Sequence, residues 1–258
     1  MKVILFSDWH IGITKESAIR KQLAEMVECK PDLLINAGDN TGTASGYKCT
    51  RQIAGWVREY FPETPVLWTN GNHDYWCGRS RGGSKPRLWQ FNQNIEKIKE
   101  CLASHKIHYL DGDGLYIHPQ HPDVIFLGVS GWYSHPRPRT NDQNYLPEGL
   151  GGDTNAFLLR RSEEALQGQL EALDRERDSM PDLPTVVFVS HFPVINTGPD
   201  YKGAFEEFCW SESLAEMLRK DYGVRHFLCG HAHQLHAGPL RYEAGSDYYS
   251  PKYLEIAI

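Results

Sequence analysis

Six short apolar runs alternate with amphipathic stretches along the chain, and this alternation constrains the fold more than any other feature. The runs are VILF (3–6), LLINA (33–37), PVLW (65–68), VIFLGV (124–129), TVVFV (185–189) and RHFLC (225–229). Each run has the length and composition of a buried β-strand. Strands that alternate with helices predict an α/β fold.

Four amphipathic stretches carry apolar residues three and four positions apart, as on one face of a helix. They contain Ile19, Leu23, Met26 and Val27; Leu88, Phe91, Ile95, Ile98 and Leu102; Leu166, Leu170 and Leu173, in a helix from about residue 162; and Leu214, Met217 and Leu218. We expect these stripes to pack in the core. Segments 77–87 and 130–156, rich in Gly, Pro and polar residues, are expected to be loops inside a single domain over residues 1–258.

Composition excludes several classes of protein. The net charge of −6 gives no general attraction to nucleic acid or acidic lipid. Six cysteines without C-x-x-C spacing argue against structural zinc and indicate reduced thiols. The apolar run at residues 3–6 is too short for a signal peptide, and no segment is long enough to span a membrane. We therefore expect a soluble, cytoplasmic protein.

Residues that can bind a metal or transfer a proton follow five of the six runs. In chain order they are Asp8 and His10; Asp39; Asn72, His73 and Asp74; His191; and His231 and His233. Because ligands gather outside the carboxyl ends of strands in open α/β sheets, we expect these residues to meet at one edge. Each motif alone is weak, since a lone histidine is more often structural, but their order and context together are a strong signal.

The residue types indicate a metal centre for an anion. Imidazole and carboxylate without thiolate favour zinc, manganese or iron. Two divalent ions beside Asp8 and Asp39 would leave a surplus of about +2, which attracts a phosphate group.

In this order, the blocks D-x-H, G-D, G-N-H-D, H and G-H-x-H resemble those of the calcineurin-like metallophosphoesterases. Every block of that family is present between Asp8 and His233. The resemblance implies a two-sheet β-sandwich flanked by helices on both outer faces. It also implies hydrolysis of phosphomonoesters, phosphodiesters or nucleic acid.

The resemblance also implies roles for individual residues. One metal ion would be held by Asp8, His10, Asp39 and His233, and a second by Asn72, His191, His231 and the shared Asp39. A hydroxide between the ions would be the nucleophile, and His73 would stay off the metals and protonate the leaving oxygen. Asp74 follows His73 directly and would either orient it or cap a helix.

The substrate is less constrained than the reaction. GDNTGTASG lacks the second acid and arginine of the protein serine/threonine phosphatases, and His73 stands where lipid-precursor pyrophosphatases carry Arg. SDWHIG resembles the opening of double-strand-break repair nucleases, and CGHAHQ is similar to cyclic-nucleotide phosphodiesterases.

Basic and aromatic residues in the two expected loops suggest a nucleotide or phosphodiester substrate, although a solvated loop with aromatic anchors is the plain alternative. The candidates for substrate binding are Arg79, Arg81, Trp132, His135 and Arg137. A DNA-repair-type nuclease and a non-catalytic scaffold with the same fold stay open as alternatives.

Overall fold

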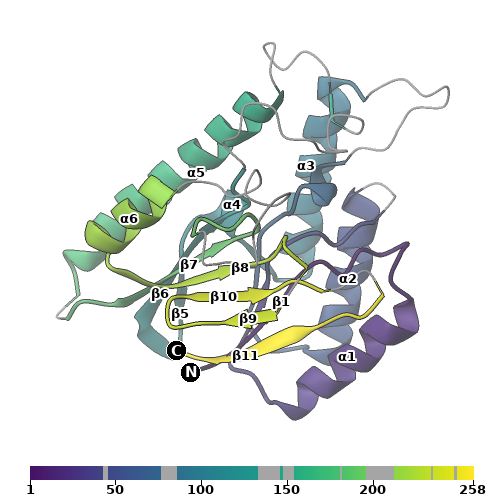
Figure 1. The fold of residues 1–258 in the computed structure, drawn as a ribbon, viewed down its shortest axis with the longest axis horizontal. Coiled ribbons are helices and arrows are strands. Elements are labelled where there is room, and N and C mark those ends of the chain that lie inside the picture. The colour runs from purple at the N-terminus through teal and green to yellow at the C-terminus, as the bar shows by residue number, and fades with distance from the viewer. Residues whose placement is uncertain are drawn as a thin grey trace.

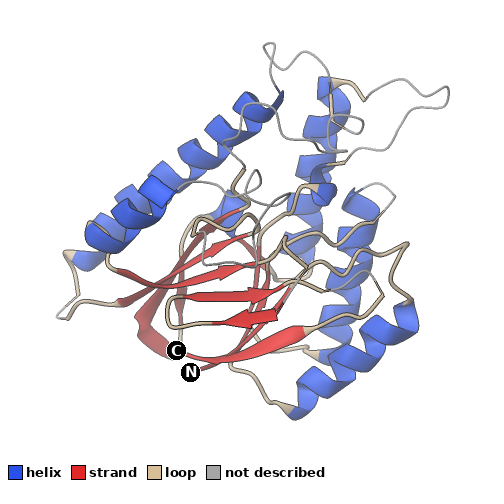
Figure 2. Ribbon diagram, in the orientation of Figure 1, coloured by secondary structure: helices blue, strands red, loops and turns tan. Residues whose placement is uncertain are grey.

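The structure, a computed structural model, describes residues 1–42, 46–76, 86–132, 146–147, 154–180, 182–195, 212–233, 235–246 and 249–258. Two mixed β-sheets lie against each other, and helices cover the outer face of each sheet (Figures 1 and 2). Helices α1 (Glu16–Glu28), α2 (Gly46–Tyr60) and α3 (Leu88–Ser104) flank one sheet. Helices α5 (Thr154–Arg177) and α6 (Glu212–Lys220) flank the other, and the short α4 (Leu110–Asp113) lies between β4 and β5 in the chain.

Both sheets have parallel centres; the first sheet has one antiparallel edge strand and the second has two. The first has the strand order β11 (Tyr253–Ala257), β1 (Lys2–Phe6), β2 (Leu33–Asn36), β3 (Val66–Trp68) and β4 (His108–Tyr109), with β11 antiparallel. The second has the order β5 (Tyr116–His118), β6 (His121–Val129), β7 (Thr185–Ser190), β8 (Val224–Cys229), β10 (Arg241–Ala244) and β9 (Leu235–Ala237), with β5 and β9 antiparallel. Parallel strands β1, β2, β3, β7 and β8 therefore deliver the loops that follow them to one edge of the sandwich.

The core is divided into three layers by the alternation of side chains along each strand. In β1, Ile4 and Phe6 pack with Leu23 of α1, whereas Val3 and Leu5 belong to the layer between the two sheets. On the outer face of the second sheet, apolar residues of β6, β7 and β8 pack against Leu166, Leu170 and Leu173 of α5. The result is the four-layer αββα sandwich that the family resemblance implied, so the expected fold class is confirmed.

The six apolar runs become β1, β2, β3, β6, β7 and β8. The helical stripes become α1, α3, α5 and α6, although Val27 and Leu88 at the margins of their stripes are exposed. One expectation was wrong, and one helix was missed. Helix α5 begins at Thr154 rather than near residue 162, and α2, with buried Ile53, Trp56 and Val57, was not predicted at all.

The described cysteines, Cys29, Cys49, Cys101 and Cys229, are free thiols, in line with the expectation from their spacing. Within the described ranges, no helix combines the length and apolar character that crossing a membrane requires.

Candidate metal centre

The loops after five parallel strands converge, and they bring all seven expected metal ligands to one edge of the sandwich. Within the first sheet, Asp8 N–H donates to Gly38 O (2.9 Å) and His10 N–H donates to Asp39 O (3.1 Å). Between the sheets, His231 N–H donates to Asp8 Oδ2 (3.0 Å). Among the described residues, three groups could hold a metal ion: Asp8, His10 and His233; His10, Asp39 and His73; and Asp39, His191 and His231.

Asp8 presents one carboxylate oxygen to two imidazoles. Its Oδ1 lies 3.8 Å from Nε2 of His10 and 3.8 Å from Nε2 of His233. Its Oδ2 accepts hydrogen bonds from the hydroxyl of Ser7 and from His231 N–H. Oδ1 is buried and accepts no hydrogen bond from any described residue. A buried carboxylate oxygen without a donor is costly unless a cation satisfies it, so these residues fit a metal ion.

A second set of donor atoms surrounds His191. Its Nε2 lies 3.1 Å from Asn72 Oδ1, 3.1 Å from His231 Nδ1 and 3.5 Å from Asp39 Oδ2. Ligands that bind one ion at about 2.1 Å lie roughly 3 to 3.5 Å from one another. The spacing around His191 is therefore that of a ligand set.

Asp39 lies between the two sets. Its Oδ2 is 3.9 Å from His10 Nε2, 3.5 Å from His191 Nε2 and 3.9 Å from His73 Nε2. Its Oδ1 accepts the His73 backbone N–H at 2.9 Å, which fixes the orientation of the carboxylate. One oxygen of Asp39 thus faces imidazoles from both candidate ligand sets.

Backbone carbonyls orient three of the imidazoles. Nδ1 of His10 lies 3.0 Å from Thr41 O, Nδ1 of His191 lies 2.7 Å from Ala37 O, and Nδ1 of His233 lies 2.7 Å from Ser246 O. A carbonyl only accepts, so each Nδ1 carries a proton, and each Nε2 faces the centre, where it can offer a lone pair to a metal when the imidazole is neutral. These carbonyl partners left no signal in the sequence, because any residue type supplies them.

Five of the seven candidate ligands have a left-handed backbone. The φ angles are 57° for Asp8, 42° for His10, 56° for Asp39, 77° for His231 and 55° for His233. Residues with a Cβ rarely adopt this region, and the strain persists only where the surroundings enforce it. Such strain gathers at functional sites, and the sequence motifs did not reveal it.

Burial and neighbouring charges shift the pKa values of the clustered residues in different directions. Burial lowers the pKa of His10 to about 4, and burial together with the neighbouring His191 holds the pKa of His231 well below its usual value. Although burial alone would lower it, the Asp39 carboxylate raises the pKa of His191 to about 9. Burial opposes ionisation of Asp39, but His191 and His73 hold its pKa well below the usual range. Asp39 is therefore an anion, while His10 and His231 are neutral.

His73 occupies the rim of the centre. Its side chain is 16% exposed, and its ring stacks on that of Trp76 with the centroids 3.7 Å apart. The ring of His10 lies edge-on to it at 4.8 Å. His73 therefore reaches both the candidate ligands and the solvent side.

Asp74 joins two loops and accepts no hydrogen bond from His73. Its carboxylate accepts hydrogen bonds from Gly71 N–H (2.9 Å), Asn40 N–H (2.9 Å) and Asn40 Nδ2 (3.0 Å). Burial, followed by the charge of Asp39, raises the pKa of Asp74 to about 7. The geometry supports neither orientation of His73 nor helix capping; instead Asp74 holds the loops after β2 and β3 together.

Of the expected substrate-binding residues, the structure describes one. Trp132 is completely buried, and its ring lies 5.2 Å from that of Phe192 and 6.0 Å from that of Tyr75. It packs in the interior and faces no solvent-accessible subsite. Arg79, Arg81, His135 and Arg137 lie outside the described residues.

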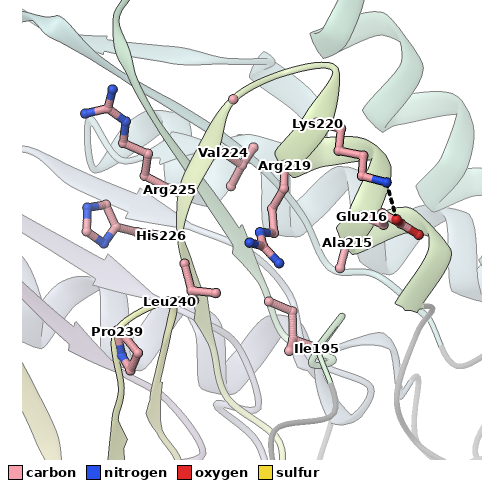
Figure 3. A pocket seen from close by; sticks show the side chains of 11 residues that line it. Ile195, Ala215, Glu216, Arg219, Lys220, Val224, Arg225, His226, Pro239 and Leu240 are labelled. Carbon is pink, nitrogen blue, oxygen red and sulfur yellow. Dashed lines mark hydrogen bonds and ion pairs between the residues drawn. The ribbon is translucent and has the colours of Figure 1, made fainter.

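A cavity of about 900 Å³ lies apart from this cluster, between α6 and strand β8 (Figure 3). Arg219 and Ala215 of α6 and Val224 of β8 line it, together with Leu240 and Ile195. None of the candidate ligands contributes to it. Cavity size therefore does not mark the candidate metal centre, which is identified by its donor atoms.

Comparisons with known proteins identify a family and a fold. The family model of the calcineurin-like phosphoesterases matches residues 1–235. A phosphopantetheinyl hydrolase from Mycobacterium tuberculosis has a similar structure, with a TM-score of 0.65, 15% identity, and coverage of 95% of this chain and 88% of that chain. A dimetal phosphatase from Danio rerio has a TM-score of 0.50 at 13% identity, with coverage of 94% and 86%. At such identities the likeness shows a shared fold. No curated protein matches the chain in sequence.

Proposed function

The chain belongs to the family of calcineurin-like phosphoesterases, and from this premise we propose that it hydrolyses phosphate esters with two divalent metal ions. The observation that carries the proposal is the position of Asp39. Its Oδ2 lies within 3.9 Å of His10 Nε2 on one side and within 3.5 Å of His191 Nε2 on the other. A carboxylate in that position can be shared by two ions.

The donor atoms divide into two sets around that shared carboxylate. Asp8, His10 and His233 would complete the first set, and Asn72, His191 and His231 the second. Imidazole and carboxylate ligands suit manganese, iron or zinc. When bound, two such ions supply a nucleophile by lowering the pKa of water, and they offset the negative charge on phosphoryl oxygens.

The net charge of the proposed site favours an anionic ligand. Asp8 and Asp39 are the only carboxylates in the proposed ligand set, and together with two divalent ions they leave a surplus of about +2. The amide of Asn72 takes a ligand position without adding negative charge. A phosphate ester is therefore attracted to the centre.

We assign His73 as the general acid. Its ring is held by stacking on Trp76, and its backbone is fixed by the hydrogen bond to Asp39 Oδ1. Its partial exposure supports this role, because a leaving ester oxygen needs access to solvent. Proton donation to that oxygen is typically worth about 10²- to 10⁴-fold in rate.

The proposal is made for phosphoesters as a class. The preference for a nucleotide or a phosphodiester rests on residues of the loops around 77–87 and 130–156, and most of these lie outside the described residues. Trp132, the described candidate, is buried. The ester preference is therefore decided by experiment.

The test is hydrolysis by metal-stripped protein after addition of manganese, zinc or iron. p-Nitrophenyl phosphate, bis-p-nitrophenyl phosphate and a single-stranded oligonucleotide separate phosphatase, phosphodiesterase and nuclease. Metal-restored turnover of any of the three supports the proposal. Asp123→Asn, at an exposed position at the far end of β6, serves as the matched control and should retain full activity. Two bound ions without turnover of any ester would instead favour the scaffold alternative.

A further inference from the structure

Strand β10 carries a buried ion pair that no sequence motif marked. Arg241 is 2% exposed and Glu243 is completely buried, and their side chains form an ion pair. The two residues share one face of the strand because they are two positions apart. Removing both charges from water is expensive, and the attraction between them offsets the cost only when further hydrogen bonds are made. Those further bonds show what the pair does.

Each partner of the pair also holds a neighbouring backbone segment. Glu243 Oε1 accepts the N–H of Ala232 at 3.0 Å, and Arg241 Nη1 donates to Ile195 O at 3.2 Å. Ala232 lies between the candidate ligands His231 and His233, and Ile195 lies four residues after His191. The ion pair thus ties together the two loops through which the second sheet contributes to the metal centre.

The loop around Ala232 needs such support. His231 and His233, on either side of Ala232, both have a left-handed backbone. This conformation is unfavourable for residues with a Cβ and must be imposed by the surroundings. A hydrogen bond to an ionised carboxylate is stronger than one to a neutral acceptor. Among the described residues, the Ala232 N–H has one other acceptor, Gly230 O at 3.1 Å, which is neutral. Loss of the Glu243 acceptor therefore relaxes both histidines together.

We infer that Glu243, held by Arg241, is a positioning residue of the metal centre. By fixing the backbone at Ala232, it places His231 Nδ1 and His233 Nε2, which belong to different ligand sets. The inference rests on the proposed function, since the roles of the two histidines are part of that proposal. Neither Glu243 nor Arg241 belongs to the proposed set of metal ligands.

A matched pair of double variants isolates the acceptor. Arg241→Met with Glu243→Gln removes both charges but keeps an oxygen that can accept the Ala232 N–H. Arg241→Met with Glu243→Met removes the charges and the acceptor at similar volume, and such apolar replacements of buried ion pairs often preserve stability. Calorimetric titration of the metal-free proteins with Mn²⁺ compares their affinities. We expect the Met/Gln variant to bind within about 3-fold of the wild type, and the Met/Met variant to bind about 10- to 100-fold more weakly.

A second measurement does not depend on metal. Hydrogen exchange at the Ala232 amide of the metal-free protein should be slow in the wild type and the Met/Gln variant, and faster in the Met/Met variant. Glu216→Gln, in an exposed ion pair with Lys220 on α6, is the control and should change neither quantity. Wild-type Mn²⁺ affinity in the Met/Met variant, or equal losses in both double variants, would overturn the inference. A wild type that binds no Mn²⁺ would overturn the proposed function instead, while the Ala232 exchange still tests the contact itself.

Discussion

Asp39 is the residue on which both proposed ligand sets depend. Replacement by Asn keeps its size but removes the negative charge that faces His10, His73 and His191. Substitution of a residue that orients a metal ligand, but does not bind the metal itself, typically lowers metal affinity by about 10- to 100-fold. Substitution of a ligand shared by two ions should have a larger effect. We expect Asp39→Asn to lose more than about 100-fold in metal affinity and to retain fewer than two ions after dialysis.

Metal content by mass spectrometry and Mn²⁺ titration check this expectation. Asp123→Asn, which removes an exposed carboxylate, should retain both ions. Full retention of two ions in Asp39→Asn would show that the carboxylate bridges nothing.

His73→Ala separates a general acid from a ligand. Because His73 lies at the rim, its removal should leave metal content unchanged and lower kcat by about 10²- to 10⁴-fold for an ester with a poor leaving group, such as phenyl phosphate. The loss should be smaller for p-nitrophenyl phosphate, whose leaving oxygen needs less protonation. Loss of metal would instead assign His73 to the ligand set with His10 and Asp39, which its 3.9 Å distance from Asp39 Oδ2 allows.

The raised pKa of His191 leads to a prediction about how metal affinity depends on pH. The neighbouring Asp39 raises the pKa of His191 to about 9 in the metal-free protein. A raised pKa means that the folded state holds this proton, so the stability it contributes is present below pH 6.5 and is lost as pH rises toward 9. Metal binding requires the neutral imidazole and must displace the proton. Mn²⁺ affinity should therefore rise by up to about tenfold per pH unit between pH 7 and 8.5.

Titration calorimetry in buffers of different ionisation enthalpy measures the protons released in that window. About one proton per protein should come from His191. An affinity that stays constant from pH 7 to 8.5 would contradict this assignment of the proton.

At the scale of elements, the loops after β2 and β3 form one unit around Asp74. Asp74→Ala leaves three buried donors, on Gly71 and Asn40, without their acceptor. An unsatisfied buried donor costs about 1–3 kcal/mol, so the free energy of unfolding should fall by about 3 kcal/mol or more. Urea unfolding of the metal-free protein measures the change, and the exposed Asp123→Ala should have little effect. A loss below about 1 kcal/mol would mean that Asp74 does not hold the loops together.

Elements that are buried on both faces were readable from the sequence. Strands β1, β2, β3, β6, β7 and β8 are continuous apolar runs, because they face the other sheet on one side and helices on the other. The edge strands β4, β5 and β9 have only two or three residues each, too few for a periodic signal. Helix α2 was missed although Ile53, Trp56, Val57 and Tyr60 have helical spacing, because its first half offers mainly small and polar residues.

In the candidate site, too, some features could be predicted from the sequence and others could not. The side chains of the sequence motifs, from Asp8 to His233, were identifiable because aspartate, asparagine and histidine are typical metal ligands. The hydrogen-bond partners that orient these side chains were not identifiable, because a backbone carbonyl such as Ala37 O can be supplied by any residue type. Arg241 and Glu243, alternating with Tyr242 and Ala244, had the pattern of a half-exposed strand, and only the packing around β10 shows that they are buried.

At the scale of the whole molecule, the candidate metal centre lies where the two sheets meet. Asp8, His10, Asp39 and Asn72 follow strands of the first sheet, and His191, His231 and His233 follow strands of the second. Hydrogen bonds already cross between the sheets near these ligands, from His231 N–H to Asp8 Oδ2 and between His191 Nδ1 and Ala37 O. Away from the site, the sheets meet in the apolar layer around Leu5, Phe126 and Val187. Ions held from both sides would add further links between the sheets, and we expect them to stabilise the fold as a whole.

Metal removal should consequently destabilise the entire domain rather than only its loops. A ligand at 100 times its Kd adds about 2.7 kcal/mol per site, so two ions add about 5 kcal/mol. For a chain of this size that raises Tm by roughly 10 to 20 °C. Thermal unfolding with Mn²⁺ and with EDTA measures the shift, which should appear as one cooperative transition in both conditions. Asp39→Asn should show most of the shift lost, whereas Asp123→Asn should match the wild type. Two bound ions without a rise in Tm would contradict this prediction, because it would mean that the unfolded chain binds the ions about as well as the folded chain does.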